Sequence, residues 1–402
     1  MGRVPPRAQP ATPADLSLLV SSARRALAGY ALSGFLAALP GALLPAWGHH
    51  LSFQFTTVGF YFLALGIGIL LSPLAVRPLL ARRGIAAVLV LAAALASITL
   101  AVTAFVGPPL PPYWRQAGLL LVGTAIGVLN FGLFQAVAPA YRMNAAATVS
   151  MAGVFFGAGC LLAALSVGGT FYAYTVPQIL LLVALVPACF AAIYRNTSFP
   201  PPSLIDEPTF RRSLTDFANP AAVLLALLLF FQFGNEWSIA AWLCVYLIHR
   251  LGVSPESALS LLALYFLALL VGRIAAVAVL PQVPHGRILF SSAAAAMFGC
   301  ILLLLTNNLF GAIVGILLTG GGFATIYPLV AERIGHRFDY YQPGLFSGIF
   351  SLAMIGGTLA PASLGFLADV AGMWVVMALP MAGTVMVVLL IGLIWLEAKI
   401  GG

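Results

Sequence analysis

The chain has 402 residues, of which 62% are hydrophobic and only 7% are charged, and its mean hydropathy is +1.07. A soluble domain carries about 25% charged residues on its wetted surface, so a water-soluble globular protein is excluded. The formal net charge of +8 would suggest nucleic-acid binding in a soluble protein. Here the basic residues lie between apolar runs, so they indicate membrane topology and we expect no nucleic-acid partner.

Apolar runs of about 20 residues recur along the whole chain, and a helix of that length crosses the hydrocarbon core of a bilayer. The sequence therefore predicts an all-α membrane protein with twelve transmembrane helices. In chain order, the expected spans are 24–47, 52–76, 84–106, 116–139, 144–169, 174–194, 220–248, 256–281, 286–306, 308–331, 344–368 and 371–396.

The longest connection between spans is polar and proline-rich and separates the sixth span from the seventh. We therefore expect two six-helix halves, at residues 24–194 and 220–397, joined by a cytoplasmic linker at 195–219. Residues 1–23 contain Pro5, Pro6, Pro10 and Pro13 and are expected to form a disordered cytoplasmic tail.

The positions of arginine and lysine predict the orientation, because these residues concentrate in cytoplasmic connections. With the N-terminus in the cytoplasm, only Arg115 and Arg250 fall on the outer side of the membrane, and the other basic residues lie on or near the inner side. Both termini are therefore expected in the cytoplasm, with the protein in the cell (inner or plasma) membrane.

Cofactor and enzyme chemistry find no support in the sequence. The four cysteines, Cys160, Cys189, Cys244 and Cys300, all lie in apolar runs, and their spacing fits no metal site or disulfide framework. There is no Walker sequence after a strand and no Ser/His/Asp constellation. We therefore expect no cofactor, no metal and no enzymatic activity.

The C-terminal half carries four successive motifs: G-x-E-x-S-I-x-x-W-L in the seventh span, G-R ending the eighth, Y-P in the tenth and G-G-x-x-x-P-x-x-x-G-x-x-A-D in the eleventh. Their residues are Gly234, Glu236, Ser238, Ile239, Trp242 and Leu243; Gly272 and Arg273; Tyr327 and Pro328; and Gly356, Gly357, Pro361, Gly365, Ala368 and Asp369. This succession resembles the sugar-transporter branch of the major facilitator superfamily, the fucose and glucose/galactose permease-like proteins. The resemblance implies the major facilitator fold, a monomer and secondary transport by alternating access.

The N-terminal half departs from the family pattern. The segment SPLAVRPLLARRG lies where the superfamily usually has G-x-x-x-D-R-x-G-R-R, and it lacks the acid. The resemblance assigns Arg77, Arg82, Arg83 and Arg273 to a cytoplasmic gate. Proton-coupled members of the branch keep carboxylates in their first and fourth helices, whereas this chain has none in either span.

Glu236 is the one acidic residue that the span assignment places deep in the membrane. A charge at that depth costs roughly 2.5–3.5 kcal/mol, so it persists where it faces a cavity or a partner. Amides and carboxylates bind hydroxyl groups, and an indole stacks on the apolar face of a sugar ring. The predicted substrate-binding residues are Asn130, Gln135, Gln232, Asn235, Glu236, Trp242 and Tyr327, with Glu236 as the proton-coupling candidate.

Structural roles are the alternatives for these residues: a structural acid at Glu236, a helix-joining amide at Asn130, and a packing or interface ring at Trp242. The leading functional prediction is a secondary active transporter of a small neutral solute, a sugar or polyol, coupled to protons through Glu236. The alternatives are an exporter of hydrophobic drugs or lipids and a non-transporting sensor or assembly factor. The expected partners are the solute, the lipid bilayer and, with coupling, protons.

Overall fold

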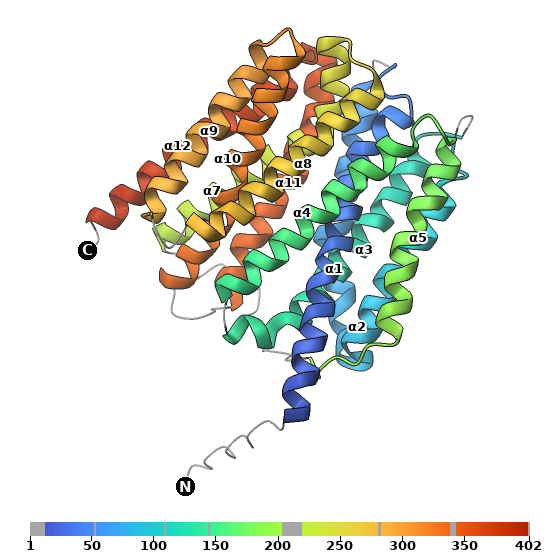
Figure 1. Ribbon diagram of the computed structural model, residues 1–402, viewed down its shortest axis with the longest axis vertical. Coiled ribbons are helices and arrows are strands. Elements are labelled where there is room, and N and C mark those ends of the chain that lie inside the picture. Colours follow the sequence, from blue (N-terminus) through green and yellow to red (C-terminus); the bar gives the residue numbers. More distant parts are fainter. Residues whose placement is uncertain are drawn as a thin grey trace.

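The computed structural model of the chain describes residues 13–51, 54–107, 110–143, 145–202, 219–279, 283–337 and 343–400. Throughout these ranges the regular structure is helical. Eleven of the helices there are long and apolar enough to cross a membrane. They lie side by side as a bundle (Figure 1).

The helices gather into two groups in Figure 1. The first group, drawn from blue to green, consists of α1 (Pro13–Ala46), α2 (Phe55–Thr103), α3 (Tyr113–Met143), α4 (Ala145–Thr170) and α5 (Val176–Arg195). The second group, drawn from yellow to red, consists of α7 (Pro220–Leu251), α8 (Pro255–Val279), α9 (His285–Leu305), α10 (Leu309–Arg337), α11 (Pro343–Ala371) and α12 (Val375–Ile400). Apart from the second and third, each predicted span coincides with one of these helices.

The second and third predicted spans both lie largely within α2, which has 49 residues. A straight helix of that length would measure about 74 Å, more than twice the thickness of the hydrocarbon core. Helical geometry breaks at Gly84, whose φ of 76° suits glycine because it has no Cβ. The Trp47 ring contacts Tyr61 near the start of α2 and shares a pocket lining with Thr103 at its end. The chain therefore reverses at Gly84, and the predicted connection at 77–83 is helical.

The predicted tail and linker are described only in part. Helix α1 begins at Pro13, so it includes residues that the sequence assigned to the tail, while residues 1–12 lie outside the described ranges. Residues 196–202 of the predicted linker are not helical, and 203–218 also lie outside those ranges. After them, Asn219 caps α7 by accepting a hydrogen bond from the Ala221 amide at 3.0 Å, with Pro220 in the first turn.

We call the end of the bundle where α1 begins and α12 ends the terminal end, and the end that carries the α1–α2 connection the opposite end. At the opposite end the two groups touch. A Cβ added to Gly41 of α1 would lie 2.4 Å from the Ala240 carbonyl oxygen of α7, and one on Gly365 of α11 would lie 2.6 Å from Cα of Gly59 in α2. Small residues thus let the backbones of the two groups approach closely.

A carboxylate joins the groups at the same end. Asp369, near the end of α11, accepts hydrogen bonds from the amides of Phe55 at 2.8 Å and Thr56 at 2.7 Å, and from the Thr56 hydroxyl. These amides belong to the first turn of α2 and have no acceptor within their own helix. A negative charge there is also favoured by the helix dipole. Asp369 therefore caps α2 from the other group.

Candidate functional site

Glu236 lies in α7 and forms an ion pair with Arg273 of α8. Glu236 Oε1 is 2.9 Å from Arg273 Nη2, and the two side chains are 12% and 10% exposed. Gln232, one turn earlier on α7, is fully buried and donates through Nε2 to the Phe323 carbonyl oxygen of α10 at 3.5 Å. A buried charge is costly unless it is paired and hydrogen-bonded. Each member of this pair therefore offsets part of the desolvation cost of the other.

Arg273 also reaches the first group of helices. Its Nη1 donates a hydrogen bond of 3.0 Å to the carbonyl oxygen of Gly153 in α4, and α4 runs beside α8 (Figure 1). The same guanidinium thus contacts a carboxylate of one group and a backbone carbonyl of the other. The sequence assigned Arg273 to a gate by resemblance and did not indicate that it is the partner of Glu236.

The predicted substrate-binding amides Asn130 and Gln135 both lie on α3, in the first group of helices. Asn130 Oδ1 accepts a hydrogen bond of 2.6 Å from the Ser33 hydroxyl of α1, which joins two neighbouring helices. Gln135 is half-buried, and its Oε1 has no hydrogen-bond partner among the described residues. Gln135 Oε1 is therefore a buried acceptor that the described part of the chain leaves without a donor.

Asn235 and Trp242 contact neighbouring helices of their own group. Asn235 is 4% exposed and donates to the Thr384 hydroxyl of α12 at 3.3 Å. Trp242 is fully buried, and its Nε1 donates to the Pro361 carbonyl of α11 at 2.9 Å. Its ring also packs 6.2 Å from that of Phe62 in α2. In this arrangement both side chains hold helices together.

Aromatic rings surround the middle of α7. Tyr327 of α10 packs against Phe233 with ring centroids 5.4 Å apart. Trp237, the residue after Glu236, meets Phe156 of α4 edge to face at 6.0 Å. This second contact joins the two groups of helices next to the ion pair. No sequence motif marks Trp237 or Phe156, and the position of Trp237 next to Glu236 is the one local signal of its role.

The remaining arginines predicted for the gate, Arg77, Arg82 and Arg83, are exposed and lie close to the reversal at Gly84. Both ends of α2 lie at the opposite end of the bundle, so these arginines lie at the terminal end. The structure therefore places these three arginines beside the reversal of α2.

Comparison with known proteins identifies the fold. No family model matches the chain. A curated relative, an uncharacterised MFS-type transporter of Yersinia pestis, is 24% identical over 323 residues, which cover 79% of this chain and 81% of the relative. Crystal structures of the nucleoside transporter NupG and of a point mutant of the E. coli fucose:proton symporter FucP superpose with TM-scores of 0.68 and 0.60, at 12% and 16% identity. The matches cover 95% of this chain and 99% of NupG, and 94% of this chain and 99% of FucP.

The chain has the fold of a major facilitator superfamily transporter. The resemblance read from the C-terminal motifs is thereby confirmed, and these relatives are transporters and not enzymes. Within this transporter fold, Glu236 and Arg273 are a charged pair in the interior of the bundle that contacts both groups of helices.

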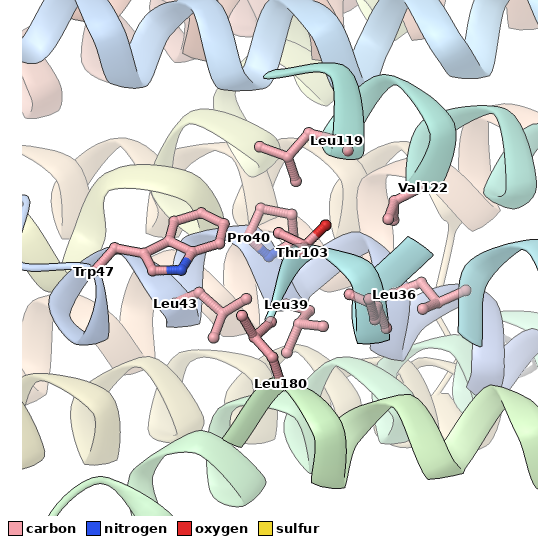
Figure 2. A pocket seen from close by; sticks show the side chains of 11 residues that line it. Leu36, Leu39, Pro40, Leu43, Trp47, Thr103, Leu119, Val122 and Leu180 are labelled. Atoms are coloured by element: carbon pink, nitrogen blue, oxygen red, sulfur yellow. The ribbon is translucent and has the colours of Figure 1, made fainter. Parts of the chain in front are cut away.

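A separate pocket of this transporter fold lies inside the first group, between α1, α2, α3 and α5 (Figure 2). Leucines, Pro40 and Trp47 form most of its lining, and the hydroxyl of Thr103 is occupied by a hydrogen bond of 2.7 Å to the Thr99 carbonyl. None of the lining residues comes from the second group. The lining of this pocket is therefore almost entirely apolar.

Replacing Trp242 with phenylalanine tests its packing role. The change removes the hydrogen bond to the Pro361 carbonyl and part of a fully buried ring. We expect a loss of about 1–3 kcal/mol in the free energy of unfolding, measured by thermal denaturation in detergent. Trp395 of α12 is 62% exposed, so Trp395→Phe is the control and should leave the stability unchanged. Equal stability of the two variants would contradict the packing role.

Proposed function

We propose that the chain is a secondary active transporter that moves a small neutral solute with sugar-like hydroxyl groups across the membrane by alternating access. The observation that carries the proposal is the Glu236–Arg273 pair, which lies inside the bundle and contacts both groups of helices. The solutes of the similar proteins support the solute class. FucP is a fucose:proton symporter and NupG a nucleoside transporter, and both solutes contain a sugar ring.

The proposed topology has twelve crossings in two six-helix halves. Because α2 reverses at Gly84, it supplies two crossings, and the remaining helices supply one each. An even number of crossings puts both termini on the same side of the membrane. The positive-inside rule favours the cytoplasmic side for them. The terminal end is then the cytoplasmic side of an inner or plasma membrane. By resemblance we propose a monomer.

The charge balance of the site supports a neutral solute. Arg273 offsets the charge of Glu236, so a charged solute would add an unpaired charge to a poorly hydrated interior. The free Oε1 of Gln135 and the Gln232 amide suit hydroxyl groups. Trp237 offers a ring for an apolar face. Tyr327 completes this part of the proposed site, while Asn130, Asn235 and Trp242 would shape it through the helices that they join.

Proton coupling through Glu236 is part of the proposal. A carboxylate beside a permanent cation can gain and lose a proton within the membrane, and a change in its charge alters the contacts of its partner. The chain has no acid in the first or fourth predicted span, so the coupling of this transporter would depend on α7.

An exporter of hydrophobic drugs or lipids is the second candidate. The rings of Phe233, Tyr327 and Phe350 that pack beside the middle of α7 favour it, since such rings suit amphipathic cargo.

The test is uptake of a labelled solute panel into proteoliposomes, with and without a pH gradient. The panel contains hexoses, polyols, nucleosides and lipophilic cations. Saturable uptake of a hydroxylated solute, raised by an inward proton gradient, is the expected result. Thermal stabilisation of the purified protein by the same solute should accompany it. Uptake and stabilisation by lipophilic cations alone would favour the exporter and overturn the proposal.

A further inference from the structure

The Arg273 side chain makes one contact with each of the two groups of helices. Nη2 is 2.9 Å from Glu236 Oε1 in α7, and Nη1 is 3.0 Å from the Gly153 oxygen in α4. The planar guanidinium holds its donors in a fixed fork, so movement of one contact moves the other. The Arg273 guanidinium therefore links the Glu236 carboxylate to the contact between α4 and α8.

Two glycines of α4 make room for this side chain. A Cβ on Gly153 would lie 3.8 Å from Arg273 Cδ, and a Cβ on Gly157, one turn later, would lie 3.7 Å from Nη1. Each distance is ordinary contact, so the arginine lies against the bare backbone of α4. A larger side chain at Gly157 would occupy the position of the guanidinium. The spacing of the two glycines thus forms a groove for Arg273.

We propose that Arg273 is the positioning residue that converts protonation of Glu236 into a change in the contact between α4 and α8. The inference rests on the proposed function in one respect, that Glu236 is the protonation site. A proton taken from water adds to the Glu236 carboxylate and removes its charge. Arg273 keeps its charge and is left buried with a backbone carbonyl as its acceptor. A buried cation without a counter-charge is strongly disfavoured, so the state in which Arg273 reaches water gains population.

The neighbouring titratable groups do not replace Glu236 in this role. Tyr265 of α8 and Cys160 of α4 lie close enough to interact electrostatically with both members of the pair, and Cys300 of α9 lies near Tyr265. A phenol and a thiol ordinarily titrate above pH 8. Among the described residues near the pair, Glu236 is therefore the group whose ordinary titration range lies lowest.

The direction of the motion follows from the position of the contact. Gly153 lies nearer the start of α4 than its end, and α4 begins at the terminal end of the bundle. The contacts of Gly41 and Gly365 hold the opposite end together. Release of Arg273 from the groove should therefore separate the terminal ends of the two groups.

The test measures the distance between spin labels at the terminal end by double electron–electron resonance at pH 8 and pH 5. Ala81 of α2 and Gly286 of α9 are exposed and take the labels as Ala81→Cys and Gly286→Cys. Cys189 is exposed and is replaced by serine, whereas the other three cysteines are buried. In this background we expect the distance to increase at pH 5, and we expect Glu236→Gln to show the longer distance at both pH values.

Three further variants separate the role of Arg273 from a general effect on packing. Arg273→Gln and Gly157→Val should abolish the pH-dependent change. Gly169 lies on the same helix with no atom within 4 Å of an added Cβ, so Gly169→Val is the matched control and should keep the change. A pH-dependent change that persists in Arg273→Gln would overturn the proposal, even if Gly157→Val fails to fold.

Solute exchange measured on the same preparations keeps the two proposals distinct. If the protein exchanges a solute of the panel but its distance does not respond to pH, the role of Arg273 is refuted and the transport function stands. If the distance responds to pH in the expected variants but no solute is exchanged, the transport function is refuted and the role of Arg273 stands.

Discussion

Replacing Glu236 with glutamine is expected to abolish pH-driven accumulation of the solute while energy-independent exchange continues. The amide keeps the shape and much of the hydrogen bonding of the carboxylate but cannot gain or lose a proton. Uptake into proteoliposomes under an inward proton gradient should therefore fall to the level reached without a gradient. Counterflow of labelled against unlabelled solute measures the remaining exchange. Accumulation that survives with an unchanged pH dependence would refute coupling through Glu236.

The same variant should also lower the free energy of unfolding, and a double variant provides the control. Glu236→Gln leaves Arg273, which is 10% exposed, without a counter-charge, and breaking a buried pair in this way costs about 3–5 kcal/mol. The double variant Glu236→Gln with Arg273→Gln removes both charges and should recover most of that stability. Thermal unfolding of the single and double variants measures the difference. If the double variant is no more stable than Glu236→Gln, the ion pair is not what stabilises this region.

Replacing Gly365 with valine is expected to prevent closure of the opposite end of the bundle. The added Cβ would lie 2.6 Å from both Cα of Gly59 and the Phe55 carbonyl oxygen, so α2 and α11 could not keep their present separation. Overpacking of this kind costs about 1–3 kcal/mol, and 1.4 kcal/mol is a tenfold change in an equilibrium. The state in which this end is closed should lose about 5–150-fold in population, and solute exchange should fall with it.

Spin labels at the opposite end measure this shift. Leu51, in the connection between α1 and α2, is 78% exposed, and Val370, near the end of α11, is 72% exposed, so Leu51→Cys and Val370→Cys report the separation. Gly392 of α12 has no atom within 4 Å of an added Cβ, which makes Gly392→Val the matched control. A longer distance in Gly365→Val alone is the expected result. An unchanged distance with normal exchange would show that α2 and α11 do not form a gate.

Asp369 shows how a local sequence feature acquires a role through the fold. The sequence placed this acid at the end of a span within a family motif. The structure shows that its carboxylate caps α2, which begins more than 300 residues earlier, at Phe55. Nothing in the neighbourhood of Asp369 in the chain indicates that partner, because the first turn of any helix presents the same free amides.

The amino-acid sequence by itself determined the class of the protein and the position of most helices. These depend on local composition, because any segment of about 20 apolar residues is long enough to cross the hydrocarbon core. The sequence predicted the connection between these two spans at 77–83, a few residues before the reversal at Gly84. The reason is that the segment from Arg77 to Arg83 has the polarity of a loop but forms helix.

Only the tertiary structure decided which residues surround Glu236. It brought Arg273 to the carboxylate and to the Gly153 carbonyl, placed Trp237 against Phe156, and turned Asn235 and Trp242 toward α12 and α11. The physical reason is that the lipid-facing and protein-facing sides of a transmembrane helix are both apolar, so hydrophobic periodicity does not mark the inward face. Which helix faces line the interior is determined by close packing at small residues and by polar contacts between segments far apart in the chain.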